Sequence, residues 1–261
     1  MTEVFRFTDA IVRSPSPSVV AGLRAVDRGA PRFEDVVAEH EAYAEALEAA
    51  GVTVHQLPPL DRFPDSLFVE DPALVFQEGA IVLRPGAPSR FGEAAAMAPT
   101  LRERFGLVLQ LPGPGFADGG DVLVTPRSVM IGLSDRTDRT GAEALVELLD
   151  RLGRHGEIVT TPPGVLHFKS DCSLIDTDTI LSTPRLAASG VFSNFRVLHT
   201  AEGEEGAANA LRVNDHLLVS DAYPETALML ADAGYRVVRL KTDEIAKIDA
   251  GLSCMSLRWH A

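Results

Sequence analysis

Residues Gly119–Leu149 read GGDVLVTPRSVMIGLSDRTDRTGAEALVELL and hold most of one structural unit. After Asp121 come two short β-type runs, Val122–Val124 and Val129–Leu133, separated by a turn, which predict a hairpin. A DRTG loop then leads to a stretch in which leucines recur at three- and four-residue steps, typical of an amphipathic helix over Ala142–Leu152. The chain returns as the β-type run EIVTTP. The predicted unit is therefore strand, strand, helix, strand.

This order of elements recurs along the chain with a period of 50 residues. Asp71, Asp121 and Asp171 each precede a pair of β-type runs, and a helix over Glu93–Arg104 is expected after the first pair. A fourth, shorter unit spans residues 207–240. One such unit cannot bury its own apolar face, so repeated units must stack or close into a ring. With four to five units we expect a ring, and a plain α/β sandwich is the alternative.

The fifth unit of such a ring has to come from both ends of the chain together. The N-terminal part offers a strand within Phe5–Val12, a helix over Arg32–Ala50 and a strand over Val52–Leu57. The C-terminal part offers a last strand in Gly251–Trp259, GLSCMSLRW. The prediction is a single α/β domain of residues 1–261 with pseudo-fivefold symmetry, in which the two terminal segments complete one blade.

Composition argues against several classes of protein. A chain of 261 residues that is 46% hydrophobic and 23% charged is typical of a globular protein. No apolar run approaches the roughly 18 residues of a membrane span. The first residues include Glu3 and Asp9 and do not resemble a signal peptide, so a cytoplasmic location is expected. The net charge of −13 disfavours nucleic acid and anionic membranes as partners and suits a cationic ligand.

Cys254 and His167 are the first candidates for chemistry. Cytosolic thiols are kept reduced, so no disulfide is expected between Cys254 and Cys172, and Cys172 is assigned to the core. A cysteine and a distant histidine form the minimal pair for thiol catalysis, and the alternative is that both are ordinary packed residues. Since no CxxC, HExxH or His/Cys cluster occurs, we expect no metal and no other cofactor.

Carboxylates gather at the starts of the first two units. FPDSLFVEDP places Asp65, Glu70 and Asp71 within seven residues among apolar side chains, and ADGGD repeats the theme with Asp118 and Asp121. A carboxylate in apolar surroundings costs free energy unless a positive group meets it. One possibility is that these carboxylates are exposed turn residues. The other is that in a ring they converge on the axis and form a site for a cation, where their negative charge would keep a cysteine thiol protonated while the site is empty.

The chain resembles the dimethylarginine dimethylaminohydrolases, of the guanidine-modifying superfamily, along essentially its whole length. The motifs that carry the resemblance are RFPDSLFVEDP, RPGAPSRFGE, ADGGDVLV, GLSDRT, VLHFKS, GYRV and KIDAGLSCMSLR. It implies the pentein fold, a five-bladed α/β propeller of ββαβ repeats. It also implies hydrolysis of dimethylarginine or monomethylarginine to citrulline and an amine through a covalent thiouronium intermediate.

Carried over residue by residue, the resemblance implies two groups of site residues. Cys254 would be the nucleophile, His167 the general acid and base, and Asp118 its carboxylate partner, a position that holds Glu in some relatives. The substrate-binding residues would be Leu23, Asp65, Phe68, Glu70, Asp71, Arg90, Arg136 and Ile248. In this set the carboxylates would contact the cationic end of the substrate, and the two arginines would hold its amino-acid carboxylate.

Two other functions stay open at the level of sequence. Arginine and agmatine deiminases share the same catalytic groups. They resemble this chain less, because they have an arginine before the aspartate of the first acidic motif, whereas Glu70 stands before Asp71 here. The chain also lacks room for the helical insertion of arginine deiminases. The other alternative is a non-catalytic protein that binds cationic ligands with Cys254 inert. The expected partner is a small cationic amino acid, and exposed sheet edges would allow a homodimer.

Overall fold

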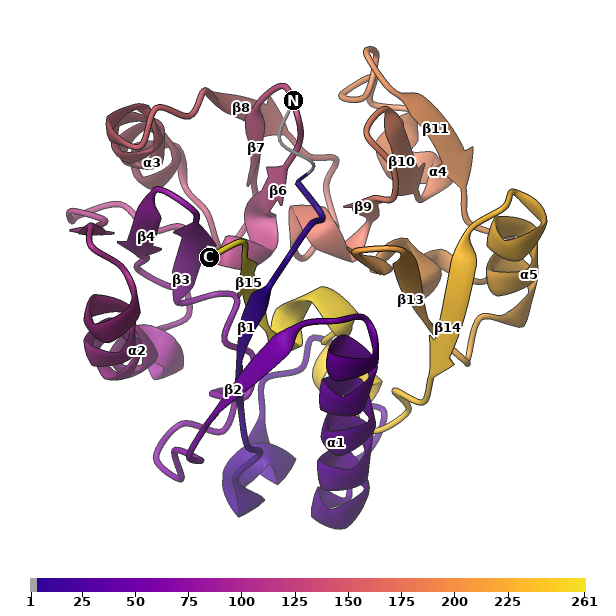
Figure 1. The fold of residues 1–261 in the computed structure, drawn as a ribbon, viewed down its shortest axis with the longest axis horizontal. Coiled ribbons are helices and arrows are strands. Elements are labelled where there is room, and N and C mark those ends of the chain that lie inside the picture. The colour runs from indigo at the N-terminus through magenta and orange to yellow at the C-terminus, as the bar shows by residue number, and fades with distance from the viewer. Residues whose placement is uncertain (1–3) are drawn as a thin grey trace.

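The computed structural model describes residues 4–261, which form five three-stranded sheets arranged around a central axis (Figure 1). In every sheet an inner strand pairs antiparallel with a middle strand, and the middle strand pairs parallel with an outer strand. A parallel pair needs a crossover connection, and a helix usually supplies it. The predicted five-bladed α/β propeller is confirmed.

The strands and helices have the following bounds. The inner strands are β3 (Ala73–Phe76), β6 (Val122–Val124), β9 (Cys172–Leu174), β12 (Leu211–Val213) and β15 (Leu257–Trp259). The middle strands are β4 (Gly79–Val82), β7 (Val129–Leu133), β10 (Thr179–Ser182), β13 (His216–Ser220) and β1 (Asp9–Arg13). The outer strands are β5 (Val108–Gln110), β8 (Gly156–Thr160), β11 (Arg196–His199), β14 (Arg236–Leu240) and β2 (Thr53–Leu57). The helices are α1 (Phe33–Ala49), α2 (Phe91–Arg104), α3 (Arg139–Arg151), α4 (Pro184–Ala187) and α5 (Pro224–Asp232).

The two ends of the chain share one sheet, in the order β15-β1-β2. Asp9 lies opposite Trp259 in the antiparallel pair and opposite Thr53 in the parallel pair. The last strand is therefore held by backbone hydrogen bonds to the first, which keeps the segment just before it in a fixed position near the axis (Figure 1).

Two elements differ from the sequence prediction. The first strand begins at Asp9, not Phe5, because the backbone of Phe5 and Phe7 pairs with Asn214 instead of with a neighbouring strand. The third unit, where no helix was expected, has the four-residue α4, whose first turn is capped by the side chain of Thr183. A proline at the first helical position favours this start.

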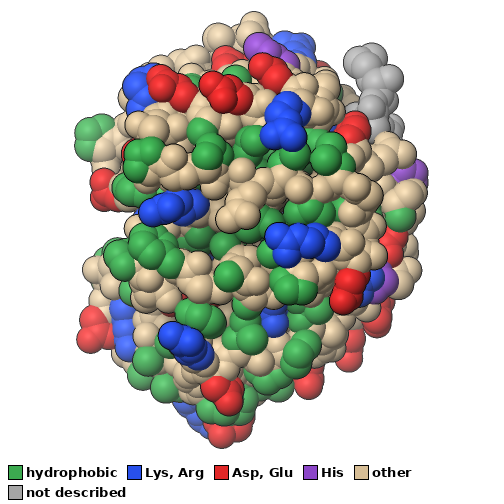
Figure 2. Space-filling model, turned by 90° about the vertical axis from the view of Figure 1, so that its left-hand side faces the viewer, with side chains coloured by type: hydrophobic (Ala, Val, Ile, Leu, Met, Phe, Trp, Pro, Cys, Tyr) green, Lys and Arg blue, Asp and Glu red, His purple; other side chains and the backbone are tan. Residues whose placement is uncertain are grey.

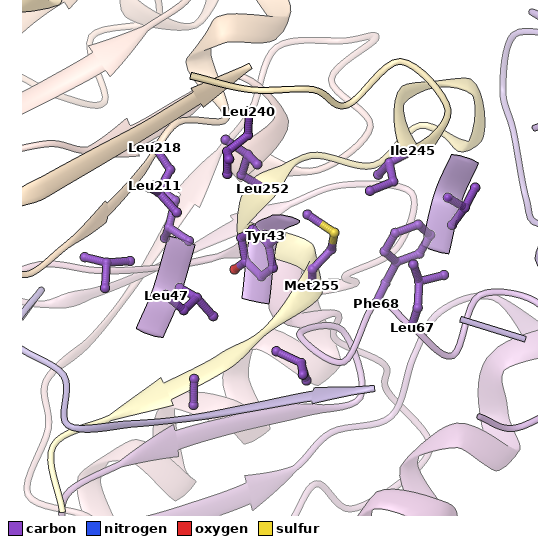
Figure 3. Packing of buried hydrophobic residues seen from close by; sticks show 14 of the residues in the cluster. Tyr43, Leu47, Leu67, Phe68, Leu211, Leu218, Leu240, Ile245, Leu252 and Met255 are labelled. Atoms are coloured by element: carbon purple, nitrogen blue, oxygen red, sulfur yellow. The ribbon is translucent and has the colours of Figure 1, made fainter. Parts of the chain in front are cut away.

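The largest apolar cluster lies under α1 and extends to the C-terminal segment. Figure 3 shows Leu252 and Met255 among Tyr43, Leu47 and other side chains of this cluster. Leu252 and Met255 are 1% and 0% exposed and flank Cys254 in the 3-10 helix η7 (Leu252–Met255). Burying two such side chains contributes about 1.5–3 kcal/mol each. The core therefore anchors the segment that carries Cys254.

The charged side chains of one face and the character of the helices can be described directly. On the face in Figure 2, lysines and arginines are scattered among hydrophobic, uncharged and acidic side chains. Within residues 4–261, no helix combines the length and the apolar character needed to cross a bilayer.

Candidate active site

The side chains singled out from the sequence come from the segments that lead into the inner strands. Glu70 and Asp71 precede β3, the 3-10 helix η3 (Gly119–Asp121) precedes β6, η4 (Phe168–Ser170) precedes β9, and η7 precedes β15. Because the inner strands surround the axis, these segments meet at one end of it. The nearest polar atoms of Asp71, Asp118 and His167 all lie within 4.8 Å of one another.

His167 and Asp118 form a buried pair. The imidazole Nε2 lies 3.1 Å from Asp118 Oδ2, and the other carboxylate oxygen accepts the N–H of Gly86 at 2.7 Å. Burial lowers the pKa of His167, but the Asp118 hydrogen bond and the charges of Asp71 and Asp121 outweigh it and raise the pKa to about 9. At neutral pH the imidazole is therefore protonated and can act as an acid.

Gly119 and Gly120, between Asp118 and Asp121, leave no room for a side chain. A Cβ on Gly119 would lie 2.0 Å from the carbonyl oxygen of Glu70, and one on Gly120 would lie 2.9 Å from both Asp71 Oδ1 and His167 Cγ. With no side chain, Gly120 donates its N–H to Asp71 Oδ1 at 3.0 Å. The two glycines of the ADGGD motif are therefore explained by the close approach of the Glu70 backbone to Gly119 and of the Asp71 and His167 side chains to Gly120.

Asp121 stabilises the positions of Asp118 and His167 through hydrogen bonds to neighbouring groups. It is fully buried, and it accepts hydrogen bonds from Thr137 Oγ1 at 2.7 Å and from the Phe168 N–H at 2.8 Å. Thr137 Oγ1 in turn accepts the N–H of Asp118 at 3.0 Å. Burial raises the pKa of Asp121 to about 6, against the opposing effect of the charge on His167. Asp121 thus ties the backbone next to Asp118 to the backbone next to His167.

Arg90 is buried against carboxylates. Its guanidinium pairs with Asp71, lies 2.7 Å from Glu93 Oε2 and donates to the Phe68 carbonyl at 2.9 Å. Burial raises the pKa of Asp71, but the Arg90 charge outweighs this and lowers it below the ordinary value. The structure thus places Arg90 as the counter-ion of Asp71. Its predicted contact with a substrate carboxylate stays a prediction.

Arg136 is the freer of the two arginines predicted for substrate binding. Its half-buried side chain makes no hydrogen bond or ion pair with any side chain of residues 4–261, although its charge lowers the pKa of Asp65. Burial is the larger effect on Asp65 and leaves the pKa of its carboxyl group raised. An arginine beside a buried carboxylate and without a fixed partner is suited to bind an anionic group.

Leu23, Asp65 and Ile248 lie together at the rim. The Leu23 N–H donates to Asp65 Oδ1 at 2.9 Å, and a Cβ on Gly22 would lie 3.2 Å from Ile248 Cγ2. The side chain of Leu23 remains 38% exposed. The ring of Phe68 is 4% exposed and packs in the core cluster of Figure 3, and its carbonyl accepts a hydrogen bond from Arg90. Its role in substrate binding stays a prediction.

Glu70 lies at the floor of the site in a network of four blades. One carboxylate oxygen pairs with Lys169 and lies 3.4 Å from Arg258 Nη2, and the other accepts the Ser253 hydroxyl at 3.0 Å. The side chain of Asn209 accepts the Ser253 N–H at 3.0 Å and donates to the Lys169 carbonyl at 2.9 Å. Lys169, Asn209, Ser253 and Arg258 were not assigned to the site from the sequence. Ser253 and Lys169 lie within two residues of Cys254 and His167, whereas Asn209 lies near no predicted site residue in the sequence.

Cys254 is half-buried next to this floor, and its carbonyl accepts the N–H of Glu70 at 3.2 Å. Burial raises the pKa of its thiol, and the charges of Glu70 and Asp71 raise it further, to about 12. The thiol is thus protonated in this state, as the ring of carboxylates predicted. Asp71 acts on the charge of both His167 and Cys254, which puts the three side chains in one electrostatic environment.

The third acidic residue of the repeat serves a different purpose. Asp171 pairs with Arg185 and accepts the Thr183 hydroxyl at 2.9 Å, so it holds the start of α4. Asp171 was a marker of the repeat and was not among the carboxylates expected on the axis, and it lies in an ion pair within its own blade. Asp171 turns back into its own blade because Arg185 lies there.

Comparison with known proteins agrees with this arrangement. A family model described as arginine deiminase matches residues 60–215. The N(G),N(G)-dimethylarginine dimethylaminohydrolase of Pseudomonas aeruginosa is 36% identical over 97% of this chain and 100% of its own length. The chain belongs to the dimethylarginine dimethylaminohydrolase family. The Streptomyces coelicolor protein of the same name is 33% identical over 95% of this chain and 96% of its own length.

Solved structures extend the comparison to three dimensions. A cysteine-to-serine mutant of the P. aeruginosa dimethylarginine dimethylaminohydrolase, complexed with citrulline, matches with a TM-score of 0.94 at 36% identity and covers 97% of this chain and 100% of its own. The N-terminal domain of ArgZ, an arginine dihydrolase, matches with a TM-score of 0.85 at 18% identity, covering 96% of both chains. The latter likeness concerns the fold alone.

Proposed function

We propose that the chain hydrolyses N-omega,N-omega-dimethylarginine and monomethylarginine to citrulline, with release of dimethylamine or methylamine. The observation that carries the proposal is a protonated His167 paired with Asp118 in the same electrostatic environment as the Cys254 thiol and Asp71. A thiol, a proton donor and carboxylates form the set of groups that attack on a guanidinium carbon requires.

Positioning is the first contribution of the site. A guanidinium is resonance-stabilised and a poor electrophile, so it has to be held as a cation with its carbon exposed. Asp71, ionised through Arg90, and Asp65 at the rim are the carboxylates that we assign to its nitrogens. Fixing the guanidinium plane for perpendicular approach of the sulfur contributes several kcal/mol. We assign Arg136 to the amino-acid carboxylate, and Leu23 and Ile248 to the rim that covers the bound substrate.

The reaction follows in two halves. In the first, the Cys254 sulfur forms a bond to the guanidinium carbon, and the carbon–nitrogen bond to the dimethylamino group breaks as His167 gives that nitrogen its proton. In the second, His167 takes one proton from water, the resulting hydroxide attacks the thiouronium carbon, and the carbon–sulfur bond breaks. The remaining proton of that hydroxyl group passes to the departing sulfur as the citrulline carbonyl forms, so the products are citrulline, protonated His167 and the Cys254 thiol. Asp118 keeps the imidazole oriented and favours its protonated form between these steps.

The bound cation also activates the thiol. A pKa of about 12 leaves very little thiolate in the empty site at neutral pH. A substrate guanidinium next to the sulfur offsets the charges of Glu70 and Asp71 and favours the thiolate, so we propose that the nucleophile forms only when substrate is bound.

The decisive experiment supplies dimethylarginine, monomethylarginine, arginine and agmatine separately and measures citrulline, amine and ammonia. We expect citrulline with dimethylamine or methylamine from the first two. Ammonia from arginine as the main product would instead identify a deiminase. Cys254→Ser should abolish turnover while the substrate still binds, and Cys172→Ser is the matched control because Cys172 is fully buried in another cluster. Substantial turnover by Cys254→Ser would overturn the assignment of the nucleophile.

We also propose that the five blades form one domain and that outer strands such as β2 allow a homodimer. A single cooperative calorimetric transition and a sedimentation mass of twice 28.0 kDa would support these proposals. Separate transitions or a monomeric mass would contradict them.

A further inference from the structure

The loop that carries Arg136 is organised by a serine hydroxyl. Ser134 Oγ accepts the backbone N–H of Arg136 at 2.9 Å and that of Thr137 at 3.2 Å. The Ser134 N–H also donates to the Thr137 carbonyl at 3.1 Å, which holds the two ends of this segment together. Serine side chains often stabilise turns through such bonds to the residues that follow them. The position of the Arg136 backbone therefore depends on the Ser134 hydroxyl.

Asp121 orients the hydroxyl groups of this loop. Its Oδ2 accepts a hydrogen bond from Ser134 Oγ at 2.6 Å and another from Thr137 Oγ1 at 2.7 Å. Because each hydroxyl donates its one proton to Asp121, the lone pairs of Ser134 accept from the loop backbone and those of Thr137 accept from the backbone N–H of Asp118. The other oxygen of Asp121 accepts the N–H of Phe168, next to the catalytic histidine. One carboxylate thus connects the arginine loop with the buried histidine–aspartate pair.

The Arg136 backbone is held from its other side by Gly86. A Cβ on Gly86 would lie 2.6 Å from the Arg136 carbonyl oxygen, so the two backbones pack without space for a side chain. The Gly86 N–H donates to Asp118 Oδ1 at 2.7 Å. The arginine loop is therefore fixed between Asp121 and Asp118, two carboxylates that also raise the pKa of His167.

Asp121 differs from Asp71 in having no basic side chain as its partner. Asp71 is paired with Arg90, whereas Asp121 forms no ion pair with any lysine or arginine of residues 4–261. Burial raises the pKa of Asp121, and the positive charge of His167 acts against this effect. A buried carboxylate costs free energy unless hydrogen bonds and a nearby cation offset the cost. The charge of Asp121 and the proton on His167 therefore stabilise each other.

We propose that Asp121 is a positioning residue for both ends of the substrate. Through Ser134 it places Arg136 for the amino-acid carboxylate. Through the Phe168 N–H and its own charge it keeps His167 in place and protonated for the leaving amine. This inference rests on the proposed function, in which both groups are assigned to the substrate. Loss of the Asp121 charge should change substrate binding and proton transfer together, whereas loss of the Ser134 hydroxyl should change binding alone.

Two ligands and an NMR titration test the two effects without turnover. Citrulline has the amino-acid carboxylate, and 4-aminobutylurea is the same molecule without it. In calorimetry, Ser134→Ala should bind citrulline about tenfold more weakly than the wild type and 4-aminobutylurea equally well, with the pKa of His167 still about 9. Asp121→Asn should weaken citrulline binding to a similar extent and lower this pKa by roughly one unit or more. In steady-state kinetics, Ser134→Ala should raise KM alone, whereas Asp121→Asn should also lower kcat about tenfold.

Thr125→Ala is the matched control for the loss of a loop hydroxyl. Thr125 Oγ1 accepts the N–H groups of Arg127 and Ser128 at 3.2 and 3.1 Å, the same pattern as at Ser134. It lies in the turn between β6 and β7, at the end of β6 that is remote from η3. This variant should match the wild type in ligand binding, in the titration of His167 and in turnover.

Three results would each overturn the inference. They are an unchanged titration of His167 in Asp121→Asn, a Ser134→Ala variant whose binding change is the same for the two ligands, and an equal loss of citrulline binding in Thr125→Ala. If Asp121→Asn does not fold, Ser134→Ala alone decides the positioning of Arg136. If the binding and titration results are as expected but the wild type turns over no methylarginine, the proposed function fails and the positioning role stands.

Discussion

The proposed activation of Cys254 can be tested directly on the charge of its thiol. Cys172→Ala removes the other thiol, so one thiol ionisation remains; the three tyrosines also ionise in this pH range, and the curve of a Cys172→Ala, Cys254→Ser double variant is subtracted to remove their contribution. In this background, a saturating, unreactive alkylguanidinium should lower the pKa of Cys254 from about 12. The physical reason is that the ligand brings a positive charge to a sulfur whose surroundings, Glu70 and Asp71, disfavour the thiolate.

The size of the effect follows from the pKa of the Cys254 thiol in the empty site and in the site with ligand bound. With a thiol pKa of about 12, forming the thiolate at pH 7 costs about 7 kcal/mol, at about 1.4 kcal/mol for each pH unit. An opposite charge within a few ångströms shifts a pKa by roughly 1–3 units, so the ligand should recover about 1.4–4 kcal/mol of this cost. The thiolate population at neutral pH should then rise by about ten- to a thousandfold.

Thiolate absorbance in the ultraviolet, recorded against pH with and without ligand, measures both states. An alkylurea of the same length is the neutral control and should leave the curve unchanged. Identical curves with and without the alkylguanidinium would refute substrate-assisted activation. So would a free-enzyme thiol that titrates near the ordinary cysteine value of about 8.5, since the environment described above would then have no effect.

Three further predictions concern His167 and the floor of the site. Asp118→Asn removes the hydrogen bond that contributes most to the raised pKa of His167. NMR titration should show this pKa falling from about 9 by at least about one unit, and steady-state kinetics should show kcat falling about a hundredfold. An unchanged titration would contradict the pairing of His167 with Asp118. Lys169→Met removes the nearer of the two cations beside the Glu70 carboxylate and should slow alkylation of Cys254 at any given pH, whereas Lys169→Arg should restore most of the rate. The folded pKa of His167 lies above its ordinary value of 6.5, so its stabilisation is complete below about pH 6.5 and is lost as the pH rises through about 9. The free energy of unfolding, measured with urea, should decrease by on the order of 3 kcal/mol over that pH range. The Asp118→Asn variant should show a smaller decrease. If the wild type and this variant show the same pH dependence, His167 is neutral in the folded state.

The repeating order of elements was accessible from the sequence because each blade obeys local rules. Val122–Val124 and Val129–Leu133 are observed with the predicted bounds, since a hairpin of short apolar runs is determined by neighbouring residues. Phe5–Phe7 was misassigned because its partner, Asn214, is about 200 residues away in the chain. A backbone that pairs with one distant side chain leaves no periodic pattern in the sequence.

The site also has parts that depend on neighbouring residues and parts that depend on residues far apart in the sequence. The roles of Cys254, His167 and Asp118 were suggested by motifs that each lie within a few residues. The floor was not predictable, because Glu70 meets Ser253 across 183 residues and Arg258 across 188. Arg90 was assigned to the substrate carboxylate by the resemblance, and an arginine in a loop gives no sequence signal for its partners within the protein. Only the fold reveals that Asp71 and Glu93 already surround it.

The sheet shared by both ends of the chain has a consequence for how the molecule folds. Four blades are built from strands close in sequence, whereas the pair Asp9 and Trp259 closes a loop of about 250 residues. Contacts of such sequence separation form slowly, because the entropy of the closed loop is lost before the contact stabilises the chain. Catalytic competence should therefore appear in refolding as a late kinetic phase, after most of the circular dichroism signal has been regained.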